Sequence, residues 1–130
     1  MVSQVGTDSG PAVRVIVCDD ACHVRTLIKT ELDLEPDMEV VGEASNGVEA
    51  IDLARTEQPD VVILDLAMPV MGGLEALPRI KRAAPLAKII VFSSFEVAEM
   101  ADKAFAAGAS RYIEKSAPAY QIIAAVRTTN

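Results

Sequence analysis

The sequence is poor in several residue types, and each shortage excludes a class of protein. Its 130 residues include no tryptophan, only 4% aromatic residues and two cysteines. Two cysteines are too few for the disulfide framework of a small secreted domain, so a cytoplasmic protein is the default expectation. No apolar run approaches the roughly 20 residues that span a bilayer, and the start lacks a basic-then-apolar signal sequence. We therefore expect no membrane partner.

Positive charge is also scarce. The 12 Lys and Arg residues face 19 Asp and Glu residues, which gives a formal net charge of −7. This balance argues against direct binding of nucleic acid or of an anionic membrane by this chain. The length suits one domain, and the 51% of hydrophobic residues with few aromatics predicts an aliphatic core. Residues 1–12 lack periodicity and are predicted to be a flexible lead-in to a domain over residues 13–130.

One stretch, from Asp60 to Asp65, organises the rest of the chain. Its four central residues, Val61 to Leu64, are all apolar and leave no polar side for water. Such a run is typical of a strand buried on both faces, as strands in parallel sheets usually are. Open α/β sheets bind ligands at the carboxyl ends of their strands, and Asp65 stands at such an end. Asp65 is therefore the first candidate for a functional residue.

Strand signals alternate with helix signals along the chain. Pro78 conflicts with its helix, because proline lacks an N–H and crowds the preceding turn, so we expect it to bend the first turn or delay the regular helix. Gly108 is well placed as a C-terminal cap. Helical spacing predicts that Val97 faces the core. The alternation predicts a parallel sheet covered by helices on both faces and joined by right-handed crossovers. The expected strands are 13–18, 39–44, 60–65, 88–92 and 111–114; the expected helices are 21–34, a segment from the turn at 45–47 to 57, 74–84, 96–107 and 118–127.

Polar side chains end several of these strands and should meet at one edge of the sheet. They are Asp19, Asp20, Asp65, Ser93 and Lys115. Crowded carboxylates resist ionisation unless a positive charge lies among them, and Mg²⁺ prefers carboxylate and phosphate oxygens. A cation, an ammonium and a hydroxyl together can neutralise and position a phosphoryl group in transfer. The residue types therefore indicate phosphoryl transfer, with a carboxylate as a possible nucleophile that forms an aspartyl phosphate.

Four ordered motifs carry a resemblance to a known family. The chain resembles a two-component response regulator receiver domain over nearly its whole length, from about residue 13 to 127. The turn at Gly42–Gly47 most resembles receivers of the NarL/FixJ type, whose partner is a DNA-binding helix-turn-helix output domain. The resemblance implies a flavodoxin-like (CheY-like) fold with five parallel strands in the order 2-1-3-4-5 and five helices. The motifs are Cys18-Asp19-Asp20, Ile63-Leu64-Asp65-Leu66-Ala67-Met68-Pro69, Val91-Phe92-Ser93-Ser94 and Gly108–Lys115.

The resemblance also implies how the site holds its phosphoryl group and metal. Asp65 would accept the phosphoryl group from a phosphohistidine on a sensor histidine kinase. The metal would be Mg²⁺, with Mn²⁺ as a substitute, and Asp65 would be one of its ligands. Asp20 would bind the ion directly, Asp19 mostly through a water, and Ala67 through its backbone carbonyl. On this interpretation the chain is a phosphoacceptor rather than an enzyme with turnover.

Three further residues receive roles from the same resemblance. Ser93 would close on a phosphoryl oxygen and Lys115 would bridge to it. Tyr112 would be an aromatic switch that turns inward together with Ser93, although an ordinary core position explains it as well. The implied outcome is a change in the partner-binding face, which controls transcription through an output domain. The alternative is a stand-alone receiver that acts by protein contact. Besides the kinase, the expected partners are an output DNA-binding domain or a homodimer partner.

Other classes of protein explain single features of the sequence less well. A haloacid dehalogenase-like phosphohydrolase needs a second acid two residues after the nucleophile, where this chain has Ala67. A flavin or nucleotide binder of this fold class would need a phosphate loop after the first strand, where this chain has carboxylates. A transition-metal site at Cys18 and His23 is disfavoured, because a strand interior and a helix surface point in different directions.

Overall fold

The computed structural model of the chain describes residues 11–129. The predicted lead-in, residues 1–12, lies outside the described residues except for Pro11 and Ala12. Five strands alternate with five helices over the described part of the chain, as the sequence predicts. In chain order the elements are β2 (Val13–Cys18), α1 (Cys22–Asp33), β3 (Met38–Ala44), α2 (Gly47–Glu57), β4 (Val61–Leu64), α3 (Gly73–Ala83), β5 (Lys88–Ser93), α4 (Val97–Ala107), β6 (Arg111–Glu114) and α5 (Tyr120–Thr129).

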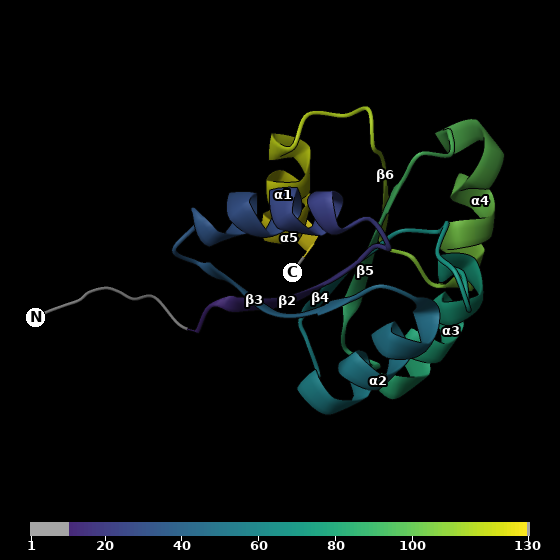
Figure 1. The fold of residues 1–130 in the computed structure, drawn as a ribbon, viewed down its shortest axis with the longest axis horizontal. Coiled ribbons are helices and arrows are strands. Elements are labelled where there is room, and N and C mark those ends of the chain that lie inside the picture. Colours follow the sequence, from purple (N-terminus) through teal and green to yellow (C-terminus); the bar gives the residue numbers. More distant parts are fainter. Residues whose placement is uncertain (1–10, 130) are drawn as a thin grey trace, which may run out of the picture.

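The strands form one parallel sheet in the order β3-β2-β4-β5-β6. Numbered along the chain, this is the predicted order 2-1-3-4-5, so the flavodoxin-like fold class is confirmed. Helices α1 and α5 lie on one side of the sheet and α2, α3 and α4 on the other (Figure 1). None of the helices within residues 11–129 combines the length and the apolar character that crossing a bilayer requires.

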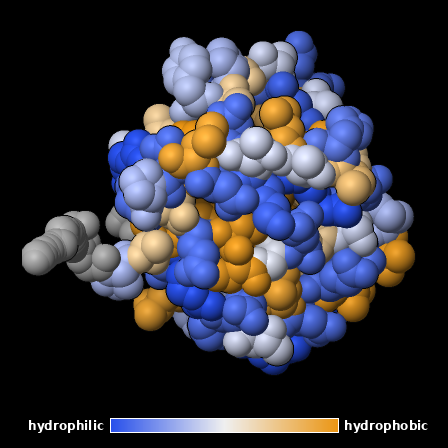
Figure 2. Space-filling model, turned by 60° about the vertical axis from the view of Figure 1, so that its left-hand side comes forward, coloured by the Kyte–Doolittle hydropathy of each residue, from blue (hydrophilic) through white to orange (hydrophobic). Residues whose placement is uncertain are grey.

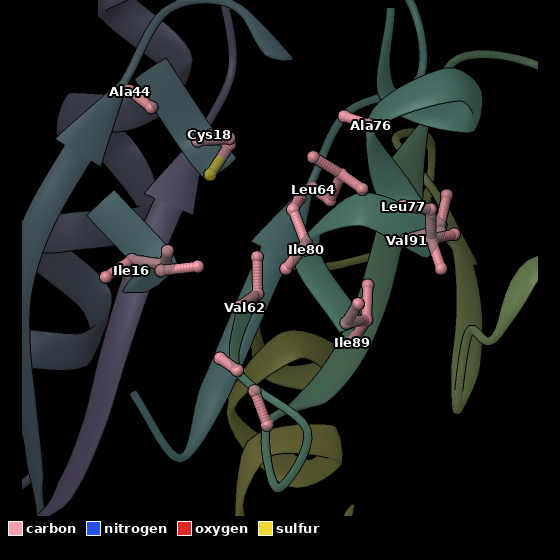
Figure 3. Close-up of a cluster of buried hydrophobic side chains, with 14 of the residues drawn as sticks. Ile16, Cys18, Ala44, Val62, Leu64, Ala76, Leu77, Ile80, Ile89 and Val91 are labelled. Carbon is pink, nitrogen blue, oxygen red and sulfur yellow. The ribbon is translucent and has the colours of Figure 1, made fainter. Parts of the chain in front are cut away.

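Alternate residues along the strands pack into two separate hydrophobic cores, one on each side of the sheet. Val62, Leu64 and their neighbours point toward α3, where they meet Ala76, Leu77 and Ile80 (Figure 3). Val61 and Ile63 point to the opposite side and pack in a cluster with residues of α1 and α5. All four residues of β4 are at most 1% exposed. This burial confirms the prediction that the strand before Asp65 is buried on both faces.

Helix ends follow the sequence signals in most places. Asn46 caps α2 with its side-chain oxygen, which accepts from the Glu49 N–H at 2.9 Å. Gly108 ends α4 with φ 119°, a left-handed conformation that glycine adopts without strain. Helix α5 begins at Tyr120, after Pro118 rather than at it.

The structure corrects one sequence expectation and part of another. Helix α3 begins at Gly73 and contains Pro78 in its interior, so the proline does not delay the regular helix, and the other arm of that expectation, a bent first turn, stays a prediction. The buried contacts of the neighbouring Leu77 and Ile80 hold the helix in place despite the missing N–H. Val97 is 47% exposed, because it occupies the first turn of α4, above the edge of the sheet.

On the face drawn in Figure 2, hydrophilic side chains surround separate hydrophobic patches.

Candidate functional site

The predicted acidic cluster forms where strands β2 and β4 end. Asp19 directly follows β2, and Asp65 directly follows β4, its neighbour in the sheet. The Asp65 N–H donates to the Cys18 carbonyl at 2.9 Å, which keeps the two strand ends together. One carboxylate oxygen from each of Asp19, Asp20 and Asp65 lies within 4.8 Å of the other two. Asp19 and Asp65 are buried, whereas Asp20 is exposed.

Lys115 supplies the cation that this cluster needs. Its Nζ lies 2.7 Å from Asp19 Oδ2 and 3.2 Å from Asp65 Oδ2. Lys115 follows β6, and its backbone N–H donates to the Ser93 carbonyl at 2.7 Å. This hydrogen bond positions the Lys115 backbone next to the end of β5, beside the acidic cluster. Burial alone lowers the pKa of Lys115. The close ion pair with Asp19 and the charge of Asp65 outweigh burial, so the pKa of Lys115 is raised and the ammonium stays charged.

Asp65 is held in an unfavourable environment for a carboxylate. Burial and the nearby charge of Asp19 raise its pKa, and together they outweigh the opposing effects of Lys115 and the Ala67 N–H. Its Oδ1 accepts from that N–H at 3.3 Å. Each carboxylate oxygen therefore has a donor, yet the site as a whole holds more negative charge than it neutralises. An added cation would relieve this imbalance.

The arrangement of Asp19 fits a divalent cation in particular. Its Oδ1 accepts from the Ala21 N–H at 2.9 Å. Its Oδ2 is buried and, among the described residues, has no hydrogen bond of good geometry, although the Lys115 ammonium is close. A buried carboxylate oxygen with a free lone pair, beside two further carboxylates, is the ligand set of a hard cation such as Mg²⁺. These residues fit the predicted metal.

Ser93 and Tyr112 stand beside the loop that follows β5. Ser93 is fully buried, and its Oγ accepts from the Phe95 N–H at 3.1 Å. Tyr112 is half-buried; its ring packs against the core on the α3 side, and its hydroxyl donates to the Phe95 carbonyl at 2.8 Å. Burial raises the pKa of Tyr112, against the opposing effect of the neighbouring Ser93 hydroxyl, so the phenol stays protonated as a donor. Tyr112 therefore packs in the core with its ring and contacts the loop after β5 with its hydroxyl.

The transition-metal alternative has no support in the described residues. Cys18 is 1% exposed inside β2, and burial, followed by the charge of Asp19, raises the pKa of its thiol to about 12. His23 lies on the exposed surface of α1. The acidic cluster found in residues 11–129 includes neither side chain.

Sequence reasoning missed two contributors to the site. The Arg25 Nη1 donates to the Asp19 carbonyl at 2.7 Å and so fixes the acidic loop from α1. Gly73 begins α3 so close to Asp65 that a Cβ atom there would collide with the Asp65 carbonyl. The arginine has no motif signal. The closeness of Gly73 to Asp65 follows only from the three-dimensional structure.

The fold and this site define a class of protein, and the comparison with known families agrees. The family model described as the response regulator receiver domain matches residues 15–127, and the chain belongs to that family. The predicted recognition is therefore confirmed.

Among the similar proteins, LiaR and the NarL receiver domain support the NarL/FixJ type, and a methylesterase matches as well. The chain is 39% identical over 118 residues to the transcriptional regulatory protein LiaR of Bacillus subtilis, which covers 91% of this chain and 56% of that protein. It is 41% identical over 105 residues to a protein-glutamate methylesterase/protein-glutamine glutaminase of Methanospirillum hungatei, covering 79% of this chain and 31% of that protein. The signal receiver domain of NarL from Mycobacterium tuberculosis superimposes with a TM-score of 0.87 at 28% identity, covering 92% of this chain and 97% of that one. The chain thus spans about a third to a half of the length of these curated relatives.

Proposed function

We propose that Asp65 is the phosphoacceptor of this receiver domain, over residues 13–130. The observation that carries the proposal is the pair of contacts that Lys115 makes with Asp19 and Asp65, at 2.7 and 3.2 Å. These contacts join the cation to both members of a buried acidic pair at the carboxyl edge of the sheet. An ammonium in this position can neutralise charge on a phosphoryl group attached to Asp65.

The chemistry proposed is a single transfer from a phosphohistidine on a sensor histidine kinase. A carboxylate oxygen of Asp65 forms a bond to phosphorus, the P–N bond of the donor breaks, and the imidazole keeps the electron pair and binds a proton. Asp19, Asp20, Asp65 and the Ala67 carbonyl would hold Mg²⁺, or Mn²⁺ in its place, which supplies positive charge to the phosphoryl oxygens. The chain is then a phosphoacceptor and not a turnover enzyme.

Two residues would respond to phosphorylation of Asp65. Ser93 is proposed to donate its hydroxyl to a phosphoryl oxygen, and Tyr112 to move with it. Both already contact Phe95, at 3.1 and 2.8 Å, so a change at Ser93 would be transmitted to the start of α4. Added charge and strong acceptor oxygens at Asp65 favour the arrangement in which Ser93 and Lys115 bind them, which shifts the populations.

The output is proposed to be control of transcription in the cytoplasm, through a DNA-binding domain of the whole protein or a homodimer. Support comes from LiaR, a transcriptional regulatory protein by name, and from the negative charge of this chain, which disfavours direct binding to DNA. The methylesterase relative favours a second candidate, an enzymatic output domain. A stand-alone receiver is the third. The coding sequence beyond Asn130 distinguishes the three.

The test is labelling by a small phosphodonor. Incubation with acetyl phosphate and Mg²⁺ should add a single phosphoryl group, seen by intact mass, to the wild-type protein and none to Asp65→Asn. Asp60→Asn is the matched control, because Asp60 lies immediately before the same strand, at its other end. Labelling of Asp65→Asn to the wild-type extent would reject the proposal.

A further inference from the structure

The start of α4 is held by a capping box of Glu96 and Glu99, and a side chain of β6 holds it in addition. Glu114 Oε2 accepts from the Val97 N–H at 2.7 Å. Val97 is the first residue of α4, and the first N–H groups of a helix have no partner within it. A carboxylate at this end is also favoured by the helix dipole. The position of the first turn of α4 therefore depends on a residue of the neighbouring strand.

The same glutamate is connected to the candidate site from two directions. Glu114 precedes Lys115 in the chain and lies opposite Ser93 in the register of β5 and β6. The segment between Ser93 and Val97 is thus held at three points. Phe95 is bound through its N–H to Ser93 Oγ and through its carbonyl to the Tyr112 hydroxyl, and Val97 is bound to Glu114. Two of the three holding side chains belong to β6.

We propose that Glu114 is a positioning residue that holds α4 in the arrangement described here and thereby opposes phosphorylation of Asp65. This inference rests on the proposed function. Movement of Ser93 toward a phosphoryl group on Asp65 displaces the segment that leads to Val97. The Glu114 carboxylate stays with the sheet, so the displacement weakens its bond with the Val97 N–H. The cost of breaking that bond disfavours the phosphorylated arrangement.

The variants separate the hydrogen bond from the charge. Glu114→Ala removes the bond, and we expect it to acquire label from acetyl phosphate about fivefold faster than the wild-type protein, the effect of one modest hydrogen bond. Glu114→Gln keeps an acceptor oxygen and should label at close to the wild-type rate. Asp102→Ala is the matched control. Asp102 is an exposed acid on α4 that makes no hydrogen bond or ion pair among the described residues, so its loss should leave the rate unchanged.

A measurement on the wild-type protein avoids any folding defect of the variants. Amide hydrogen exchange at Val97 should become faster when Asp65 is phosphorylated, because the bond with Glu114 is weakened. Unchanged exchange at Val97 would overturn the proposal, as would equal acceleration of labelling by Glu114→Gln and Glu114→Ala, or a wild-type rate in a folded Glu114→Ala. These outcomes, with Asp65→Asn unlabelled, would leave the phosphoacceptor assignment standing. Labelling of Asp65→Asn would instead remove that assignment itself.

Discussion

Lys115 Nζ lies 3.2 Å from Asp65 Oδ2, although 50 positions separate the two residues in the chain. The contact exists because β4 and β6 flank β5 in a parallel sheet and end at the same edge. The parallel arrangement of the strands therefore lets two residues that are distant in the sequence form an ion pair.

Asp65→Asn should raise stability when no divalent cation is present. Burial and the charge of Asp19 raise the pKa of Asp65, so at neutral pH the ionised side chain is less favourable in the folded protein than in the unfolded chain. Asparagine removes this cost. The midpoint of urea unfolding at pH 7 in the presence of a chelator should rise, whereas Asp102→Asn should leave it unchanged. A lower midpoint for Asp65→Asn would show that the contact with Lys115 outweighs burial.

Magnesium should stabilise the wild-type protein. A ligand that binds only the folded state adds about 2.7 kcal/mol when its concentration is 100 times Kd. Thermal unfolding with and without Mg²⁺ should show this gain in the wild-type protein and a much smaller gain in Asp20→Asn. Asp20 is exposed, so its loss weakens the site without disturbing the core. Equal gains in the two proteins would place the ion elsewhere.

Gly73→Ala should damage both the fold and the site. The added Cβ would collide with the backbone carbonyl of Asp65, which cannot rotate away as a side chain can. We expect a loss of about 1–3 kcal/mol in the free energy of unfolding, together with slower labelling. Gly72→Ala is the adjacent control, since its Cβ would lie 3.1 Å from the nearest atom, the Leu66 carbonyl oxygen. Its effect should be clearly smaller in the same urea titration.

The bridge between Asp37 and Arg127 should stabilise the fold only above acidic pH. The two side chains share hydrogen bonds of 2.9 and 3.1 Å, and the bond with Arg127 lowers the pKa of Asp37 below its ordinary 3.8. A lowered carboxyl pKa contributes stability above 3.8, which is lost as the pH falls through the lower, folded-state value. The difference in urea midpoint between the wild-type protein and Asp37→Asn should therefore be constant from about pH 7 to pH 5 and shrink below 3.8. Asp33→Asn, at an exposed acid on α1, should show no such change.

Much of the fold was predictable, because buried parallel strands have a plain signature. Val61 to Leu64 has no polar residue, so its place at the centre of the sheet follows from the sequence alone. Parallel polarity then brings Asp19, Asp65 and Lys115 to one edge without any knowledge of the loops. The acidic cluster was foreseeable for this reason.

Features that depend on exact distances were not predictable. Helical spacing predicted that Val97 lies in the core, yet it is exposed. The spacing indicates which face of a helix is turned toward the sheet, but it does not show which residues extend past the edge of the sheet. Pro78 is tolerated because tertiary contacts of Leu77 and Ile80 outweigh a local preference. The bond from Glu114 to the Val97 N–H joins residues from two elements, and neither residue type indicates it.

The two cysteines have a practical consequence. Cys22 is exposed at the start of α1, whereas Cys18 is sealed in the sheet with a thiol whose pKa is about 12. Alkylating reagents attack the thiolate, so Cys22 should react in the native protein and Cys18 only when β2 separates from its neighbours. The mass of the alkylated protein therefore reports, without any engineered probe, how often the centre of the sheet opens.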